Sequence, residues 1–431
     1  MPQAAESYYR ATAHSRIPST PLHGATNAKV CVIGGGFAGL NTALGLAERG
    51  TENVVLLEAH EVGFGASGRN GGFVFAGFSR GEESLLRELG PQAARDLYRG
   101  TTDAVALIRE RIDRYRIECD VVDAGVVWAN WFRDPAVLHR RQRLLADHYG
   151  VHWQWLQQTQ VRERIASSRY HDGLFEPDAF HFHPLKYARG IADAAIARGV
   201  AVHERTPAIA LEQRDSGWRV RTPNGTVDAE TVVLACGGYL AHLQRRVDAA
   251  VLPIATYVMV TEPLSARMGE VLTTQAAVYD TRFAFDYYRP LPDTRLLWGG
   301  RISVLDRAPD AVERLLYRDL LKVFPQLDGI GIDYAWSGLM SYARHQMPQI
   351  GELEAGLWLA QAFGGHGVAP TTMAGEVIAA AIAQGDRRWQ QFSSYGVVSA
   401  FKPAGFVGAQ LSYWWYQFKD EYMDWRERQE G

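Results

Sequence analysis

Cysteine is scarce in this sequence. Only three occur among 431 residues, at Cys31, Cys119 and Cys236, and they lie far apart. This spacing supplies neither a disulfide framework nor a metal-ligand cluster, so we expect no bound metal and a reducing, cytoplasmic setting. Positive charge is not in excess either, because the formal net charge is -3. That balance gives no electrostatic basis for binding nucleic acid or an anionic membrane.

Long apolar runs are absent as well. No run approaches the roughly 18 apolar residues of a transmembrane helix, and the first 29 residues lack the apolar centre of a secretion signal. The composition, 47% hydrophobic and 22% charged, is typical of a soluble globular protein. The length of 431 residues predicts about two or three core-forming units.

The strongest local signal is a glycine pattern near the N-terminus. Val30–Ile33 is a short apolar run, typical of a buried strand, and a G-x-G-x-x-G motif follows it directly and opens a helical pattern. A second apolar run, Asn53–Ala59, carries Glu58 about 20 residues further on, where an acid binds ribose hydroxyls and disfavours NADP. The pattern predicts a dinucleotide site, with a plain glycine turn as the alternative. The expected contacts are Gly34, Gly36, Phe37, Ala38, Gly39, Glu58 and Ala59.

Two further glycine-rich loops favour FAD over NAD. The stretch "GASGRNGG" lies just past the acid, where backbone must run along the rest of an FAD molecule, and a solvated loop is the alternative reading. The stretch "FGGHGVAP" precedes a helix with Pro370 in its first turn, so its N–H groups and the positive helix end can stabilise negative charge on a reduced flavin. A plain turn is again the alternative. The expected contacts are Gly65, Ala66, Ser67, Arg69, Asn70, Gly71, Gly72, Gly364, Gly365, His366, Gly367, Val368 and Ala369.

The remaining pattern predicts an α/β protein built from separated segments. Residues 82–169 read as mostly helical, a helix follows His183-Pro184, and residues 251–340 alternate strands and turns. We therefore expect a discontinuous Rossmann-type FAD-binding domain formed by residues 1–88, 180–245 and 341–431. A substrate domain with a mainly antiparallel sheet and helices would comprise residues 89–179 and 246–340.

At this point the sequence resembles a known family. The region from "VCVIGGGFAGL" to "GFGASGRNGG" is similar to the D-amino-acid oxidase, glycine oxidase and sarcosine oxidase (DAO) flavoenzymes, and most similar to their gamma-glutamylputrescine oxidase branch. Later stretches, "VDAETVVLACGGY", "DYYRPLPDTRLLWGGR" and "GLWLAQAFGGHGVAPTTMAGEVIA", resemble the same family in the same order. The resemblance spans nearly the whole chain.

The resemblance implies extended FAD, with adenine near Glu58 and Ala208 and with Cys236 and Gly237 beside the cofactor. It implies oxidation of a C–N bond of a small amine or amino acid, by hydride transfer to flavin N5, with oxygen or another acceptor taking the electrons. Some relatives hold flavin covalently through a Cys or a His. This chain has no Cys after Cys236 and has Arg69 at the His position, so we expect non-covalent FAD.

Four residues are candidates for catalysis or substrate binding. Tyr288 could line an amine cage and Arg289 could bind a carboxylate, although ordinary strand packing is the alternative for both. Alternation along the strand lets only one of Tyr287 and Tyr288 line a pocket. Arg344 is a second carboxylate candidate, and His366 is a base candidate that more simply packs beside the flavin.

Other features leave the electron acceptor open. Leu297 stands where sarcosine oxidases place an oxygen-activating Lys, so a dehydrogenase is an alternative to an oxidase, and a flavin-binding assembly factor without turnover is another. The "HFH" stretch at residues 181–183 reads as strand residues leading into a helix rather than a metal pair. Near the C-terminus, aromatic residues at helical spacing predict a helix docked on the protein's own surface, with membrane contact not expected: Leu411, Trp415, Phe418, Tyr422 and Trp425.

Overall fold

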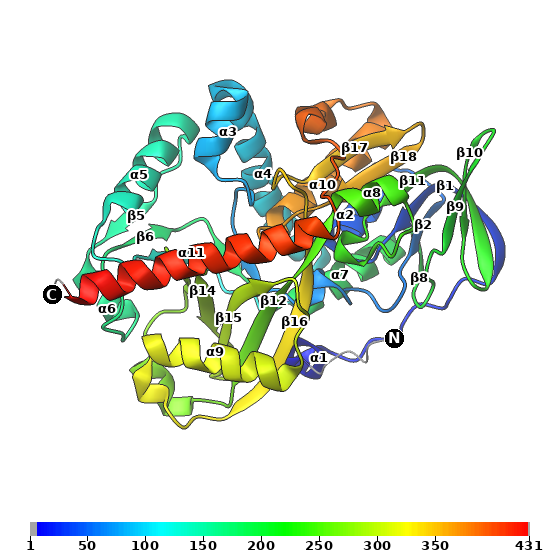
Figure 1. The fold of residues 1–431 in the computed structure, drawn as a ribbon. Helices are drawn as coiled ribbons and strands as arrows, with labels where there is room; N and C mark the ends of the chain where they lie inside the picture. Colours follow the sequence, from blue (N-terminus) through cyan, green and yellow to red (C-terminus); the bar gives the residue numbers. More distant parts are fainter. Residues whose placement is uncertain (1–6, 430–431) are drawn as a thin grey trace.

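The computed structural model describes residues 7–429, and its strands form two large sheets that lie side by side (Figure 1). The first sheet has the strand order β17-β18-β11-β1-β2-β8, with β9 and β10 extending from β11. Its core strands pair in parallel, as expected for a Rossmann-type sheet. Its strands are β1 (Gly24–Ile33), β2 (Val54–Leu57), β8 (Ala201–His203), β9 (Ala210–Arg214), β10 (Gly217–Arg221), β11 (Gly225–Leu234), β17 (Gln349–Glu354) and β18 (Leu357–Gln361).

Helices from distant parts of the sequence cover this sheet. α2 packs closely against α10, because a Cβ on Gly45 would lie 2.9 Å from Ala379 Cβ and one on Gly375 would lie 2.7 Å from Asn41. The buried Arg111 of α4 pairs with Glu48 of α2, which ties α4 to the same layer. The helices of this layer are α2 (Phe37–Glu48), α4 (Pro91–Tyr115), α7 (Pro184–Ala197) and α10 (Val368–Gln384), and α3 (Glu82–Leu89) packs against α4.

The second sheet is mainly antiparallel and has the order β16-β12-β15-β14-β13-β4-β6-β5, in which only β13 and β4 pair in parallel. α9 (Pro309–Val323) packs its buried face, including Leu316 and Leu320, against one side of the sheet. The strands are β4 (Val126–Ala129), β5 (Gln154–Leu156), β6 (Gly173–Glu176), β12 (Leu252–Thr261), β13 (Ala277–Asp280), β14 (Asp286–Pro290), β15 (Leu296–Ser303) and β16 (Ile332–Tyr342).

Short elements complete the fold. A two-stranded sheet of β3 (Phe73–Val74) and β7 (Phe180–His181) lies where the two parts meet. The predicted class, an α/β protein with a Rossmann-type sheet and a mainly antiparallel second sheet, is confirmed. The domain boundaries stay a prediction, and their ends at residues 1–6 and 430–431 lie outside the described residues. The other helices are α1 (Tyr8–Thr12), α5 (Ala136–Leu144), α6 (Gln158–Arg164), α8 (Arg245–Ala250) and α11 (Ala404–Gln429).

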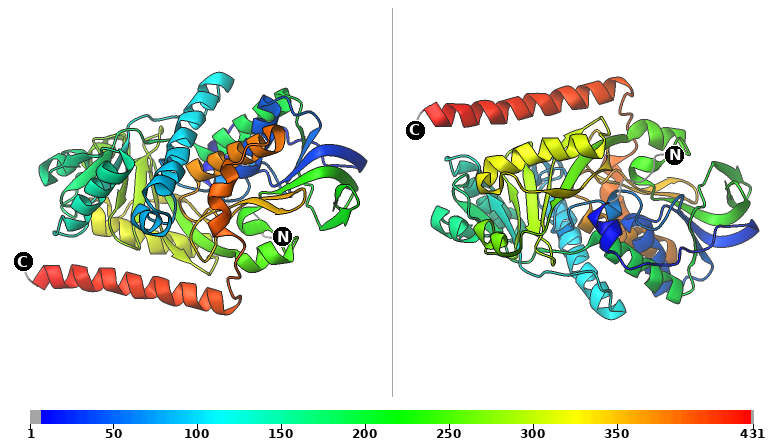
Figure 2. Two further views of the ribbon diagram at one scale, coloured as in Figure 1. Left: turned by 90° about the horizontal axis from the view of Figure 1, so that it is seen from above. Right: turned by 90° about the horizontal axis from the view of Figure 1, so that it is seen from below.

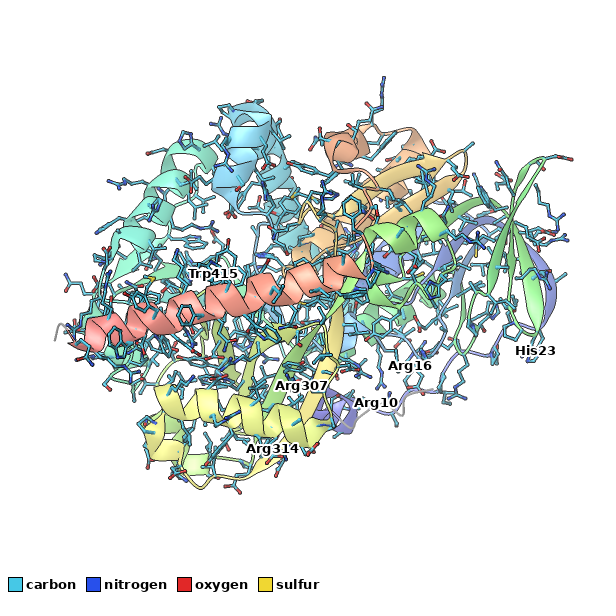
Figure 3. The ribbon with its side chains drawn as sticks, viewed as in Figure 1. Arg10, Arg16, His23, Arg307, Arg314 and Trp415 are labelled. Atoms are coloured by element: carbon cyan, nitrogen blue, oxygen red, sulfur yellow. The ribbon has the colours of Figure 1, made fainter. Side chains whose placement is uncertain are left out.

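α11 differs from the sequence prediction. Figure 2 shows it as an outer rod along one side of the molecule, and it contacts the body through residues such as Tyr413 and Asp424. The predicted aromatic stripe instead faces outward: Trp415, labelled in Figure 3, is 63% exposed. The helix therefore docks on the protein's own surface, as predicted, but through a different side from the predicted aromatic stripe. The outward residues are Leu411, Trp414, Trp415, Phe418, Tyr422 and Trp425.

Candidate functional site

One large cavity of about 2190 Å³ runs between the two sheets and is lined by residues of both. This volume exceeds the roughly 300–1,000 Å³ of ordinary small-molecule sites, so the cavity has room for a long ligand together with a second, smaller one. All three glycine-rich loops border it. Sequence segments more than 300 residues apart are thus brought to one site by the fold.

The first loop joins β1 to α2 at the wall of the cavity. Gly34 has φ +117° and its N–H donates to the Leu57 carbonyl at 2.8 Å, and a side chain there would overlap the Ala235 carbonyl. A side chain on Gly39 would overlap the Gly34 carbonyl, so Gly39 serves the helix–strand contact and does not border the cavity. Gly34, Gly36, Phe37 and Ala38 do border it. The N-terminus of α2 therefore opens toward the cavity, where it would face the phosphates of a dinucleotide.

Glu58 lies at the end of β2 and is 9% exposed. Its two carboxylate oxygens accept N–H bonds from Gly35 at 2.7 Å and from His60 at 2.8 Å. Burial raises the pKa of this carboxyl group, while the two N–H donors act against that shift. Ala59 and Ala208 border the cavity beside it. An acceptor fixed in this way suits the hydroxyls of a ribose.

The second loop is held in place on both sides and is not a solvated linker. Ser67 Oγ accepts the Phe37 N–H at 2.8 Å, which joins the loop to the first turn of α2. The Arg69 guanidinium donates to the carbonyls of Phe64 at 2.9 Å and Ser337 at 3.0 Å, which joins it to the second sheet. Gly72 points away from the cavity, toward Phe182 and Arg289. The loop residues that border the cavity are Gly65, Ala66, Ser67, Arg69, Asn70 and Gly71.

The third loop closes the site from the C-terminal side. Ser79 Oγ accepts the His366 N–H at 3.2 Å and donates to the Phe363 carbonyl at 3.3 Å. His366 Nε2 lies 3.3 Å from the Phe75 carbonyl, and burial lowers the pKa of this histidine to about 4, so the ring is neutral near pH 7. Ala369 is fully buried in α10 and does not reach the cavity. Cys236, Gly237, Gly364, Gly365, His366, Gly367 and Val368 border it.

These features together fit FAD. Small residues line a long cavity, two helix N-termini open toward it, and a buried acid stands where ribose hydroxyls would bind. The sequence model of the FAD dependent oxidoreductase family (DAO) matches residues 29–381. The chain belongs to this family. It is an FAD-dependent oxidoreductase, as the sequence resemblance predicted.

The DAO family assignment is supported by similar proteins of nearly equal length. Gamma-glutamylputrescine oxidoreductase of Escherichia coli is 37% identical over 91% of this chain and 92% of its own. A probable oxidoreductase OrdL of Haemophilus influenzae is 32% identical over 96% of this chain and 97% of its own. Among solved structures, glycine oxidase from Geobacillus kaustophilus has a TM-score of 0.74 at 21% identity, covering 88% of this chain and 99% of that one. That likeness shows the fold alone.

Two residues proposed to touch substrate lie elsewhere in this DAO fold. Tyr288 is fully buried on the α9 side of the second sheet, stacked on Trp298 with ring centroids 4.7 Å apart, so it cannot line an amine cage. Arg289 is 2% exposed and donates to the carbonyls of Gly71 at 2.7 Å and Phe182 at 2.9 Å. Its donors hold the second loop in place and are not available to a substrate carboxylate. Both sequence predictions are therefore corrected.

The remaining candidates do border the cavity of the flavoenzyme. Tyr287 takes the place proposed for Tyr288, and a Cβ on Gly71 would lie 2.5 Å from its ring. Arg344 also borders the cavity, with its guanidinium 5.4 Å from the centre of the Phe401 ring. Leu297 is fully buried beside Trp336 and does not border the cavity. Among the described residues that line the cavity, none is a lysine.

Sequence reasoning missed the far end of the cavity. Glu82, Arg141, Trp128 and Tyr279 border it from four different elements or loops, and no local motif marks any of them. Only a burial argument could have found Glu82, because an acid at the first turn of a helix reads as an ordinary dipole contact.

Residues 7–429 contain no cluster of metal ligands and no membrane-spanning helix. Within that range no group of three or more His, Cys, Asp or Glu is placed to hold a metal ion. His181 contacts Arg289 and the Gln275 carbonyl, while His183 caps α7 by accepting the Lys186 N–H. No helix in the described part of the chain is long and apolar enough to cross a membrane.

Proposed function

We propose that this flavoenzyme oxidises a C–N bond of an elongated primary amine, of the gamma-glutamylated diamine type, with non-covalent FAD. The observation that carries the proposal is the second, aromatic part of the cavity, which remains beyond the three loops that suit FAD. The 37% identity to a gamma-glutamylputrescine oxidoreductase supports the same substrate class.

The residues of the first sheet would hold the cofactor. Glu58 would accept ribose hydroxyls, the N-termini of α2 and α10 would face negative charge, and the Gly65–Gly71 backbone would lie along the ring system. FAD, when bound, supplies the acceptor for a hydride from the carbon that bears the amine. The neutral His366 ring packs edge-on against Phe75 at 4.2 Å and helps to exclude water from this point.

Non-covalent binding is supported by the chemistry of the nearby side chains. The Arg69 guanidinium is engaged by two backbone carbonyls and is no nucleophile. Cys236 borders the cavity, but its thiol donates to the Ile33 carbonyl and burial raises its pKa to about 12, so it stays an unreactive thiol.

A second candidate is an amine dehydrogenase that passes its electrons to an acceptor other than oxygen. The absence of lysine among the described lining residues favours it, because no cationic ammonium of the protein would then stand over the flavin.

The purified protein is reduced anaerobically with a panel of amines and amino acids while flavin absorbance is followed. Bleaching by an elongated primary amine supports the proposal, and no bleaching by any member of the panel would contradict it. Oxygen is then readmitted: rapid peroxide formation identifies an oxidase, and slow reoxidation identifies a dehydrogenase. Acid denaturation should release yellow FAD into the supernatant, and colour retained on the protein would contradict non-covalent binding.

A further inference from the structure

The far end of the cavity, called the chamber below, is lined by aromatic and charged side chains. From His366, ring contacts run through Phe75 at 4.2 Å, Tyr279 at 5.9 Å and Trp128 at 6.1 Å, and end at Trp153 at 6.4 Å. All five side chains line the cavity. Rings arranged in this way offer several π faces to one small volume, which suits a cation.

The ion pair between Arg141 and Glu82 lies next to these aromatic rings. The Arg141 guanidinium lies 5.2 Å from the centre of the Trp153 ring and pairs with Glu82 through both of its terminal nitrogens, one contact being 3.0 Å. A Cβ on Gly77 would lie 2.9 Å from Glu82 Oε1 and 3.5 Å from His366 Cε1. The Glu82 carboxylate therefore lies near His366, the first ring of the series. The chamber is therefore bounded by aromatic rings on one side and by Glu82 on the other.

A second acidic side chain, Glu176, lies beside this chamber, close enough for the charges of Glu82 and Arg141 to act on it. Glu176 lies on β6 opposite Val126, on the strand face that also carries Trp128, and is 7% exposed. Its Oε2 has no hydrogen-bond partner. Burial raises the pKa of Glu176 to about 8, and the charge of Glu82 acts in the same direction while Arg141 acts against it. Arg80 also borders the cavity, but it pairs with Glu88.

This arrangement selects an ammonium over a carboxylate. The fork of Arg141 is already occupied by Glu82, so its two best donors are not free for a substrate carboxylate. A nearby ammonium would favour the ionised form of Glu176 beside the Glu82–Arg141 pair, and it would also contact the aromatic rings.

The nitrogen held in the chamber is not the one that is oxidised. Hydride departure from a carbon needs the lone pair of the attached nitrogen, so the reacting amine must be neutral. Negative charge and π faces stabilise the protonated form instead, and would slow the reaction of an amine bound there. A nitrogen that stays charged throughout turnover fits the chamber.

We propose that Glu82, Glu176 and the surrounding rings form a specificity site for a second, non-reacting ammonium group at the remote end of an elongated amine substrate. This inference rests on the proposed function and adds the group that the site recognises. In a gamma-glutamylated diamine, the group of this type is the α-ammonium of the glutamyl end.

Three substrates that differ at one position test it. N-(γ-glutamyl)-1,4-diaminobutane carries both the α-ammonium and the α-carboxylate, the N-glutaryl analogue lacks only the ammonium, and the N-(4-aminobutanoyl) analogue lacks only the carboxylate. Anaerobic flavin reduction gives a Kd and a limiting rate for each. Loss of the ammonium should raise Kd roughly 30-fold, as for a desolvated cation–π contact. Loss of the carboxylate should change Kd much less, and the limiting rates should stay similar.

Two variants and a control locate the effect. Glu176→Gln keeps the shape of the side chain and should bring the Kd values of the γ-glutamyl and glutaryl compounds together. Glu82→Gln should make the glutaryl compound bind more tightly than the 4-aminobutanoyl compound, because it frees the Arg141 guanidinium to bind a carboxylate. Glu212→Gln, in an exposed pair on β9, should leave all three values unchanged. Equal Kd values for glutamyl and glutaryl compounds in the unaltered protein, or an unaltered preference in Glu176→Gln, would overturn the inference alone. If none of the three compounds, nor any other amine, reduces the flavin, the proposed function fails as well.

Discussion

Gly36 provides the sharpest test of the cofactor site, because a methyl group introduced there would lie at the cavity wall without straining the backbone. The residue caps α2 with φ -87°, a conformation that alanine adopts freely. A Cβ there would lie 2.9 Å from Ser67 Oγ, the atom that accepts the Phe37 N–H. Gly36→Ala therefore displaces one hydroxyl and places a methyl group where pyrophosphate must approach.

The two consequences differ in size. Losing the Ser67–Phe37 hydrogen bond should lower the free energy of unfolding of the apoprotein by about 0.5–1.5 kcal/mol. Losing close approach of a charged phosphate to the N–H groups and dipole of α2 should weaken FAD binding by about 2–4 kcal/mol. The second figure corresponds to a Kd for FAD raised roughly 30-fold to 1,000-fold.

Fluorescence titration of the apoprotein with FAD measures the Kd, and urea unfolding of the apoprotein measures the stability. Gly39→Ala is the matched control, because its methyl group would meet the Gly34 carbonyl inside the helix–strand contact, away from the cavity. That variant should lose apoprotein stability first and FAD affinity only as a consequence. Unchanged FAD affinity in a folded Gly36→Ala protein would show that the pyrophosphate does not lie at α2.

Three further outcomes follow from the positions of single side chains. Tyr288→Phe removes a buried hydroxyl that has no partner, so apoprotein stability and flavin reduction rates should be unchanged or slightly raised. A cavity role for Tyr288 would instead lower the reduction rate. Arg289→Met should lower the free energy of unfolding by about 1–3 kcal/mol for each carbonyl left without a donor, at Gly71 and Phe182. It should also weaken FAD binding, and chemical unfolding with and without FAD checks both. The pKa of His366 is lowered to about 4 in the folded protein, compared with roughly 6.5 in the unfolded chain. As pH falls below roughly 6.5, the unfolded chain binds a proton at this histidine before the folded protein does, which lowers the free energy of unfolding. This contribution to stability is thus lost between pH 6.5 and 4, and His366→Gln should flatten that part of an unfolding-versus-pH curve while leaving activity limbs above pH 6 in place.

Local sequence determined the cofactor-binding part of this protein to a large extent. Gly34 and Glu58 were predictable because a tight turn, a helix start and a ribose-binding acid are all encoded within about 25 consecutive residues of one βαβ unit. The start of α7 at Pro184 was predictable for the same reason, since proline favours the first helical turn.

Only the tertiary structure decided the substrate side. The alternation rule showed that Tyr287 and Tyr288 point in opposite directions, but the choice between them depends on which face of the second sheet meets the first sheet and which meets α9. Arg289 has the chemistry of a carboxylate ligand, yet four partners that are distant in sequence occupy it.

The chamber and α11 show the same limit. Glu82 and Arg141 border the cavity from two separate elements, and Glu176 on a third element lies close enough to feel their charges, because the fold brings the three together. The aromatic spacing of α11 correctly predicted a helix with an aromatic side, but periodicity does not record what that side faces. Residues adjacent in the sequence thus determined the nucleotide loops. Contacts between segments remote in the sequence determined what the cavity can recognise.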